Sequence, residues 1–278
     1  MAKSSFHARS NSFPSRPHPL ILQCNEHLDR LRASQETSSS SLLSHKLGGL
    51  RDLHDCVENL IQLPLTQEAV LHEKNCVNEL LDGSLRLLDM CTTAKDSLLH
   101  TKECTRELQS IMRRRKGGEV ELRAEVKKLL ASRKVVRKAI SKALSNLKDT
   151  TTKDNQNVAL VSLLQDMEVV TLSTFQELLQ FISGTTQSKS RNWLLISKLM
   201  QTKKVACSQL ADESEFAQLD EALQSCIFGQ TSKFEDMNKL QNHLEKVELL
   251  IQDLEEGLEF VLRRLIKIRV ALLNILNH

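Results

Sequence analysis

Proline is confined to the first quarter of this 278-residue chain, and that fact narrows the choice of folds more than any other. The four prolines are Pro14, Pro17, Pro19 and Pro64, so residues 65–278 contain none. A proline inside a helix costs about 3 kcal/mol and a glycine about 1 kcal/mol, and the chain has only eight glycines. Sheets need such residues at their turns and are enriched in aromatic side chains, which make up 3% here. The sequence therefore predicts an all-α bundle of long helices.

Composition divides the chain into three parts. Residues 1–19 are rich in serine and proline and carry basic but no acidic side chains, which predicts a disordered tail. Residues 20–40 predict a short helix and a linker, and residues 41–278 a single helical-bundle domain. The Gly48-Gly49 pair is expected to weaken the first helix of that domain. Apolar periodicity places helices at 41–63, 66–115, 119–148, 158–183 and 213–227, with another around Trp193.

The C-terminal segment has the most regular pattern. From Met237 onward, apolar residues recur at alternating spacings of three and four, which predicts a long helix with coiled-coil-like packing. The partner of this heptad stripe is either another helix of the chain or a second chain, so the sequence leaves homo-oligomer formation open. The stripe is best defined at Leu244, Val247, Ile251, Leu254, Leu258, Val261, Leu265, Ile268, Leu272 and Ile275.

Charge is unevenly distributed. Residues 113–148 hold thirteen Lys and Arg against three Glu, and residues 212–259 hold thirteen Asp and Glu against three Lys. One reading is that the acidic stretch docks on the basic helix 119–148; another is that the basic face binds an anionic membrane surface. Nucleic acid is not expected, because no aromatic residues interleave with the charges. The basic face comprises Lys127, Lys128, Arg133, Lys134, Arg137, Lys138 and Lys142.

The tail contains a candidate phosphorylation motif, Arg9-Ser10-Asn11-Ser12-Phe13-Pro14. Arg9 suits a basophilic kinase acting on Ser12, and the phosphorylated string is similar to the pattern that 14-3-3 proteins bind. An arginine cluster would hold the phosphate, and Pro14 would turn the chain away from the groove. The alternatives are a tail that only aids solubility and an organelle transit peptide.

We find no pattern that predicts an enzyme. The chain has no HExxH, GxSxG, P-loop or GxGxxG motif, and its seven cysteines include no CxxC pair. We therefore expect no small-molecule substrate, no cofactor and no metal, and we expect the cysteines to be buried and reduced. No apolar run is long enough to span a membrane, and no secretory signal is expected. A cytoplasmic location is favoured, with the membrane periphery, plastid or nucleus as alternatives.

Six separated strings, in order along the chain, resemble one plant-specific family of undefined biochemistry that is grouped with the BYPASS proteins. The resemblance implies a helical protein from a plant, with a role in root and shoot development and no established catalytic residues. We accordingly expect a non-enzymatic interaction or adaptor protein, gated by phosphorylation of the tail. The alternative is a peripheral membrane protein that uses the basic helix. The strings are HARSNSFPSRPHP (7–19), LHDCVENLIQLPLTQ (53–67), HEKNCVNELLDGSLRLLDMCTTAKD (72–96), ASRKVVRKAISKAL (131–144), FISGTTQSKSRNWLLISKLMQTKKV (181–205) and LEEGLEFVLRRLIKIRVALLNILNH (254–278).

Overall fold

The computed structural model describes residues 18–34, 39–72, 74–114, 119–147, 159–184, 214–228 and 233–277. Within these ranges every regular element is a helix, which confirms the predicted all-α class. The candidate tail motif and the helix expected around Trp193 lie outside the described residues. The helices are α1 (Pro19–Ala33), α2 (Ser40–Ile61), α3 (Pro64–His72), α4 (Lys74–Arg114), α5 (Glu119–Ser145), α6 (Ala159–Ser183), α8 (Glu215–Phe228) and α9 (Lys233–Asn277).

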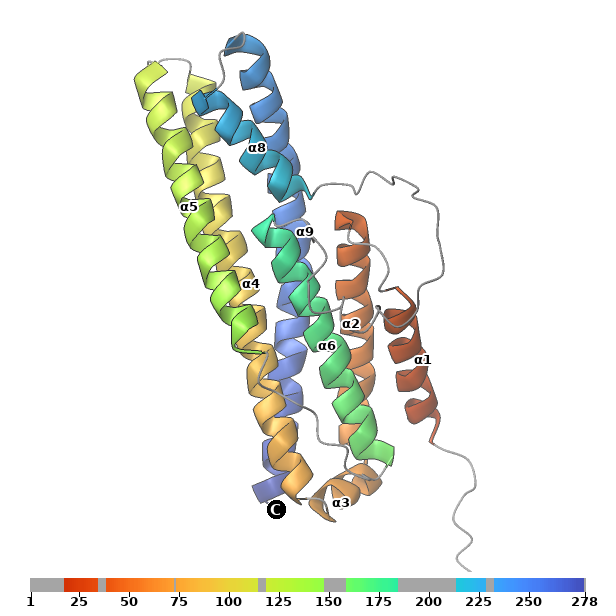
Figure 1. Cartoon of the computed structure of the whole chain (residues 1–278). Helices are drawn as coiled ribbons and strands as arrows, with labels where there is room; N and C mark the ends of the chain where they lie inside the picture. Colours follow the sequence, from red (N-terminus) through yellow and green to blue (C-terminus); the bar gives the residue numbers. More distant parts are fainter. Residues whose placement is uncertain are drawn as a thin grey trace, which may run out of the picture.

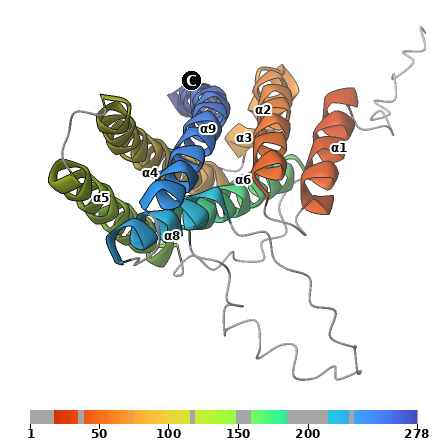
Figure 2. The ribbon, with the colours of Figure 1, turned by 90° about the horizontal axis from the view of Figure 1, so that it is seen from above.

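The long helix α9 lies at the centre of the bundle and packs against α2, α4 and α8 (Figure 1). Viewed along the bundle, α5, α4, α9, α2 and α1 follow one another in an arc, and α6 and α8 lie on one side of it (Figure 2). The short helix α3 crosses the end of the bundle where α9 finishes. This arrangement leaves the opposite side of the α4–α9–α2 row uncovered by any described helix.

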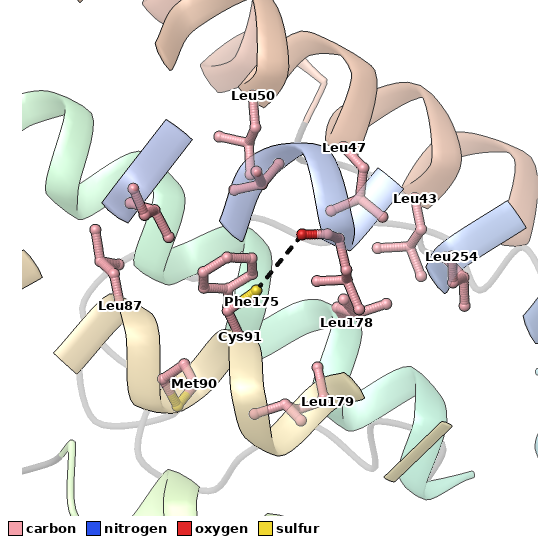
Figure 3. Close-up of a cluster of buried hydrophobic side chains, with 14 of the residues drawn as sticks. Leu43, Leu47, Leu50, Leu87, Met90, Cys91, Phe175, Leu178, Leu179 and Leu254 are labelled. Carbon is pink, nitrogen blue, oxygen red and sulfur yellow. Dashed lines mark hydrogen bonds between the residues drawn. The ribbon is translucent and has the colours of Figure 1, made fainter. Parts of the chain in front are cut away.

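The heptad stripe of α9 is buried inside the chain's own bundle. All ten of its residues, from Leu244 to Ile275, are at most 5% exposed, and α2, α4 and α8 supply the surfaces that cover them. Figure 3 shows part of this core, where Leu47 of α2, Cys91 of α4 and Phe175 of α6 lie around α9. The Cys91 thiol donates a hydrogen bond to the Leu258 carbonyl at 3.8 Å. The stripe is thus occupied by partners within the chain.

One detail of the predicted helices is wrong. The single helix expected over 66–115 is two helices, α3 and α4, because the chain changes direction between His72 and Lys74. Apolar periodicity is similar on both sides of this change and gives no sign of it. The Gly48-Gly49 pair lies inside α2, which runs from Ser40 to Ile61. A Cβ at Gly49 would lie 2.9 Å from Leu31 Cδ2, so glycine allows α1 to pack closely there.

Polar side chains also tie α2 to α6 inside the core. The Lys46 ammonium, on a side chain 2% exposed, lies 2.5 Å from a Glu177 carboxylate oxygen. His54 is fully buried, and its Nε2 forms a hydrogen bond with Thr171 Oγ1 at 2.9 Å. Burial lowers the pKa of His54 to about 4, because the interior disfavours the charged imidazolium. These two contacts fix the register between helices that are more than 100 residues apart in sequence.

Candidate interaction sites

Four lysines make the outer face of α5 strongly basic. Lys127, Lys134, Lys138 and Lys142 are exposed, and their spacing places them on one side of the helix. No carboxylate of the described residues forms an ion pair with any of the four. Val135, which is 62% exposed, lies beside these lysines on α5. We call these four residues the lysine face.

Lys128 differs from the four residues of the lysine face because it is paired with carboxylates. Its ammonium forms ion pairs with Glu107 of α4 and, at 3.2 Å, with Glu125 of its own helix. Hydrogen bonds to these two carboxylates raise the pKa of Lys128. The side chain therefore bridges α4 and α5 at the surface.

Arg133 was predicted on the basic face, and this prediction is wrong, because Arg133 is fully buried. Its Nε and Nη2 each donate a hydrogen bond of 3.1 Å to the Asp220 carboxylate of α8. The guanidinium also lies over the Phe216 ring, 5.0 Å from the ring centroid. Arg137 Nη1 donates to the same carboxylate at 2.8 Å. Both arginines therefore join α5 to α8, and only the lysines remain for an outside partner.

A sequence signal for the burial of Arg133 does exist. The residue falls in the apolar stripe of α5, four positions after Leu129 and three before Val136, both of which are buried. A charged residue at a core position needs a charged partner. The sequence could not name that partner, because Asp220 is 87 residues away.

The acidic stretch 212–259 docks only partly on the basic helix. Asp220 of α8 meets α5, but three glutamates of α9 are paired with α4 instead. The three ion pairs between α9 and α4 are Glu248 with Arg106 at 2.8 Å, Glu255 with Lys102, and Glu259 with Lys95. Opposite charges thus join neighbouring helices, as expected, but the main basic partner of the acidic stretch is α4 and not α5.

An open groove of about 580 Å³ runs between α4 and α9. Leu99 of α4 and Phe260 of α9 form its apolar part and are 50% and 48% exposed. Arg51 of α2 lies over the Phe260 ring, 5.6 Å from the ring centroid. The residues that line the groove are Lys95, Asp96, Leu99, Glu255, Glu256, Glu259, Phe260 and Arg263. We call this the α4/α9 groove.

The charges of the groove are only partly neutralised. Glu259 is held by Lys95 and by Arg263 at 2.8 Å, and hydrogen bonds from these cations lower its pKa. Asp96 at the α4 rim and Glu256 at the α9 rim have no Lys or Arg partner among the described residues. Each rim therefore carries an unpaired negative charge beside an exposed apolar side chain.

The apolar surface continues from the groove along α9. Ile266, Val270 and Leu273 are exposed and follow Glu259 by seven, eleven and fourteen residues, which places them on the same side of the helix. Leu85 of α4 is 48% exposed and lies fourteen residues before Leu99, again on one side. Sequence reasoning missed this surface, because it appears only when two separate helices lie side by side.

Metal sites and membrane-spanning helices are two other classes of site. In the part of the chain that the structure describes, no group of three or more His, Cys, Asp or Glu residues could hold a metal ion. Among the same residues, no helix combines the length and apolar character that a bilayer-spanning segment requires.

The described residues form an all-α bundle that carries four unpaired lysines on the lysine face, and two unpaired carboxylates with two exposed apolar side chains in the α4/α9 groove. The family model described as Protein BPS1 matches residues 46–275, from α2 to α9. The chain therefore belongs to the BYPASS family, which confirms the resemblance found in its sequence. Membership implies a protein related to plant development. No curated protein and no solved structure matches the chain.

Proposed function

We propose that this protein is a non-enzymatic adaptor of plant development that binds a basic amphipathic helix of a partner protein in the α4/α9 groove. The observation that carries the proposal is that the exposed Leu99 and Phe260 line the same groove as two unpaired carboxylates, Asp96 and Glu256. Apolar grooves on helical proteins are a common receptor for amphipathic helices. A helix placed there would bury its apolar side on Leu99 and Phe260.

The charges select the kind of helix. The eight lining residues include four carboxylates and two cations, and Glu255 is paired further out with Lys102. Lys or Arg residues flanking the apolar side of a partner helix would meet Asp96 on one rim and Glu256 on the other. Such rim charges contribute to specificity and to the rate of association more than to affinity.

A fluorescently labelled peptide of about five helical turns, with leucines on one side and lysines on both flanks, tests the proposal by anisotropy. We expect binding to the full chain, and a loss of about tenfold or more in affinity when Leu99→Ala and Phe260→Ala are combined. Leu249→Ala is the matched control, because Leu249 is 68% exposed on α9 but does not line the groove.

The rim is tested separately with Asp96→Asn and Glu256→Gln. We expect these variants to bind more slowly and with a weaker dependence on salt, and we expect a peptide with glutamates in place of its lysines not to bind. Equal affinity of the wild type and the Leu99/Phe260 double variant would refute the groove as the binding site. Proximity labelling in root tissue with the wild type and with the Leu99/Phe260 double variant would identify the partner that depends on the groove.

The tail adds a regulatory part to the proposal. Ser12 phosphorylation would create a site for a 14-3-3 protein through Arg9, Ser10, phosphorylated Ser12 and Pro14, a pattern present in the sequence. A pull-down with peptides of residues 5–18 tests it. Recovery of 14-3-3 protein should require the phosphate. Equal recovery with the phosphorylated peptide and with a Ser12→Ala peptide would rule out regulation by Ser12 phosphorylation.

The lysine face supports a second candidate function, contact with an anionic membrane surface. Four unpaired lysines and the exposed Val135 lie together on the outer side of α5, and each lysine near such a surface contributes about 1 kcal/mol. Co-sedimentation with phosphatidylserine vesicles should fall after Lys134→Glu with Lys138→Glu. Reversal of Lys239 and Lys246, exposed on α9, is the control. Binding that survives the first pair, or no binding in low salt, excludes this candidate.

A further inference from the structure

Two cysteines from neighbouring helices meet in the bundle interior. Cys24 of α1 and Cys56 of α2 are 0% and 4% exposed, and their Sγ atoms lie 2.6 Å apart. The Cys56 thiol also lies 3.4 Å from the Leu20 carbonyl oxygen. Both residues are free thiols in this structure. The two sulfur atoms are therefore already placed for direct reaction with each other.

The other buried cysteines differ from this pair. Cys91 lies against the Leu258 carbonyl, and Cys104 is buried on α4; among the described residues neither thiol lies against a second cysteine sulfur. A thiol packed alone in a core behaves as a small apolar side chain. The paired arrangement of Cys24 and Cys56 is thus a particular feature of the α1–α2 contact.

We propose that Cys24 and Cys56 are a reversible disulfide site that fastens α1 to α2 under oxidising conditions. The oxidant is a low-molecular-weight disulfide such as glutathione disulfide. The thiolate of one cysteine attacks it, forming a mixed disulfide and releasing one glutathione thiolate. The second cysteine thiolate then attacks the protein sulfur of the mixed disulfide and releases the second glutathione. The two protons lost by the cysteines end on the two glutathione thiols, so two thiols are oxidised and one disulfide is reduced.

The burial of Cys24 and Cys56 controls how readily the disulfide forms. It raises the pKa of both thiols, because the interior disfavours a thiolate. The closed bundle therefore protects the pair, and the first step requires α1 to separate from α2. Helix α1 has only fifteen residues, and its main contacts among the described residues are with α2 and α6, so local separation there involves a small part of the core. Once formed, the bond would prevent that separation.

The link has a consequence for the segment before α1. Residues 1–18, with the candidate phosphorylation motif, join the bundle through α1. Fastening α1 fixes the point from which that segment begins. The disulfide would in this way connect the redox state of the surroundings with the geometry of the tail's attachment.

The test incubates the full chain with glutathione buffers of increasing oxidised fraction, blocks the reaction with acid, and counts thiols after denaturation. We expect seven free thiols in the reduced protein and five after oxidation, since the chain has seven cysteines. Trypsin without reduction should yield fragment 10–30 linked to fragment 52–74. These fragments contain Cys24 and Cys56 as their only cysteines, and the Arg16-Pro17 bond resists cleavage.

Matched variants separate this pair from the rest. Cys24→Ala and Cys56→Ala should each keep all six remaining thiols under oxidation, whereas Cys91→Ala and Cys104→Ala should still lose two. Hydrogen exchange of the α1 amides should slow severalfold in the oxidised wild type and stay unchanged in Cys24→Ala.

The same incubation in urea below the unfolding midpoint promotes separation of α1 and should speed the reaction. Seven thiols at every oxidised fraction, with or without urea, would overturn the proposal. So would glutathione adducts that never resolve, or a cross-link that joins a cysteine other than these two.

Discussion

Arg133 of α5 and Asp220 of α8 are joined by two hydrogen bonds of 3.1 Å, on side chains that are 0% and 6% exposed. Phe216 covers one side of the guanidinium, and its ring meets Phe181 edge-on with centroids 5.7 Å apart. Arg137, which is 29% exposed, reaches the same carboxylate from the surface. Asp220 thus has two cationic partners, whereas Arg133 has one carboxylate.

This asymmetry predicts which substitution is worse. Asp220→Asn leaves Arg133 buried with no anion and should lower the free energy of unfolding by about 3–5 kcal/mol. Arg133→Met leaves Asp220 paired with Arg137 and should cost clearly less. Urea denaturation of the two variants measures the difference. If Arg133→Met proved the more damaging, Arg137 would not be neutralising the carboxylate.

His54 predicts a dependence of stability on pH. Its pKa is about 4 in the folded state against about 6.5 when exposed, so between these values the unfolded chain binds the extra proton. Stability is therefore lost as pH falls from about 6.5 to about 4, by about 3 kcal/mol in total. Unfolding curves of His54→Gln should show a smaller loss over this window than wild type. If His54→Gln lost as much stability as the wild type over this window, a group other than His54 would cause the loss. His100→Gln, at an exposed position, is the control.

Two helical glycines should respond oppositely to the same substitution. At Gly257 of α9, a Cβ would lie 3.0 Å from both Cβ and Cδ1 of Leu47, whereas at Gly48 of α2 nothing lies within 4 Å. Gly48→Ala should therefore gain up to about 1 kcal/mol from helix propensity. In Gly257→Ala the contact with Leu47 should cancel or reverse that gain. Thermal melts of both variants measure the two changes in stability. An equal gain in stability at both sites would mean that α2 and α9 pack less closely than the structure shows.

The heptad stripe predicts a large difference between two leucines of α9. Leu265 is 1% exposed and Leu249 is 68% exposed. Leu265→Ala should lower the free energy of unfolding by about 2–5 kcal/mol through lost burial and a residual cavity. Leu249→Ala should change it by less than about 0.5 kcal/mol. Equal melting temperatures for Leu265→Ala and Leu249→Ala would contradict the burial of the heptad stripe.

The sequence predicted the features that depend on local pattern. Long proline-free periodic segments predicted the helices, and the 3–4 spacing from Leu244 to Ile275 predicted which side of α9 is buried. The signal is strong because one helix repeats it over many turns. The change of direction after His72 left no such signal, since both α3 and α4 remain helical.

The sites depended on contacts between distant segments and were largely missed. Arg133 interrupts an apolar stripe, which shows that it is unusual, but only the packing of α8 on α5 supplies Asp220. Leu99 and Phe260 each look like an ordinary exposed residue until α4 and α9 lie side by side. Cys24 and Cys56 are likewise brought together only by the packing of α1 on α2.

The central place of α9 has a consequence for synthesis of the chain. α9 follows the other described helices in sequence, yet it supplies the surface on which α2, α4 and α8 close. While the polypeptide grows on the ribosome, the apolar side chains of those helices that contact α9 stay uncovered until residues 233–277 are made. We expect such a nascent chain to depend on chaperones for longer, and premature termination before Lys233 would leave exposed the apolar side chains that pack on α9.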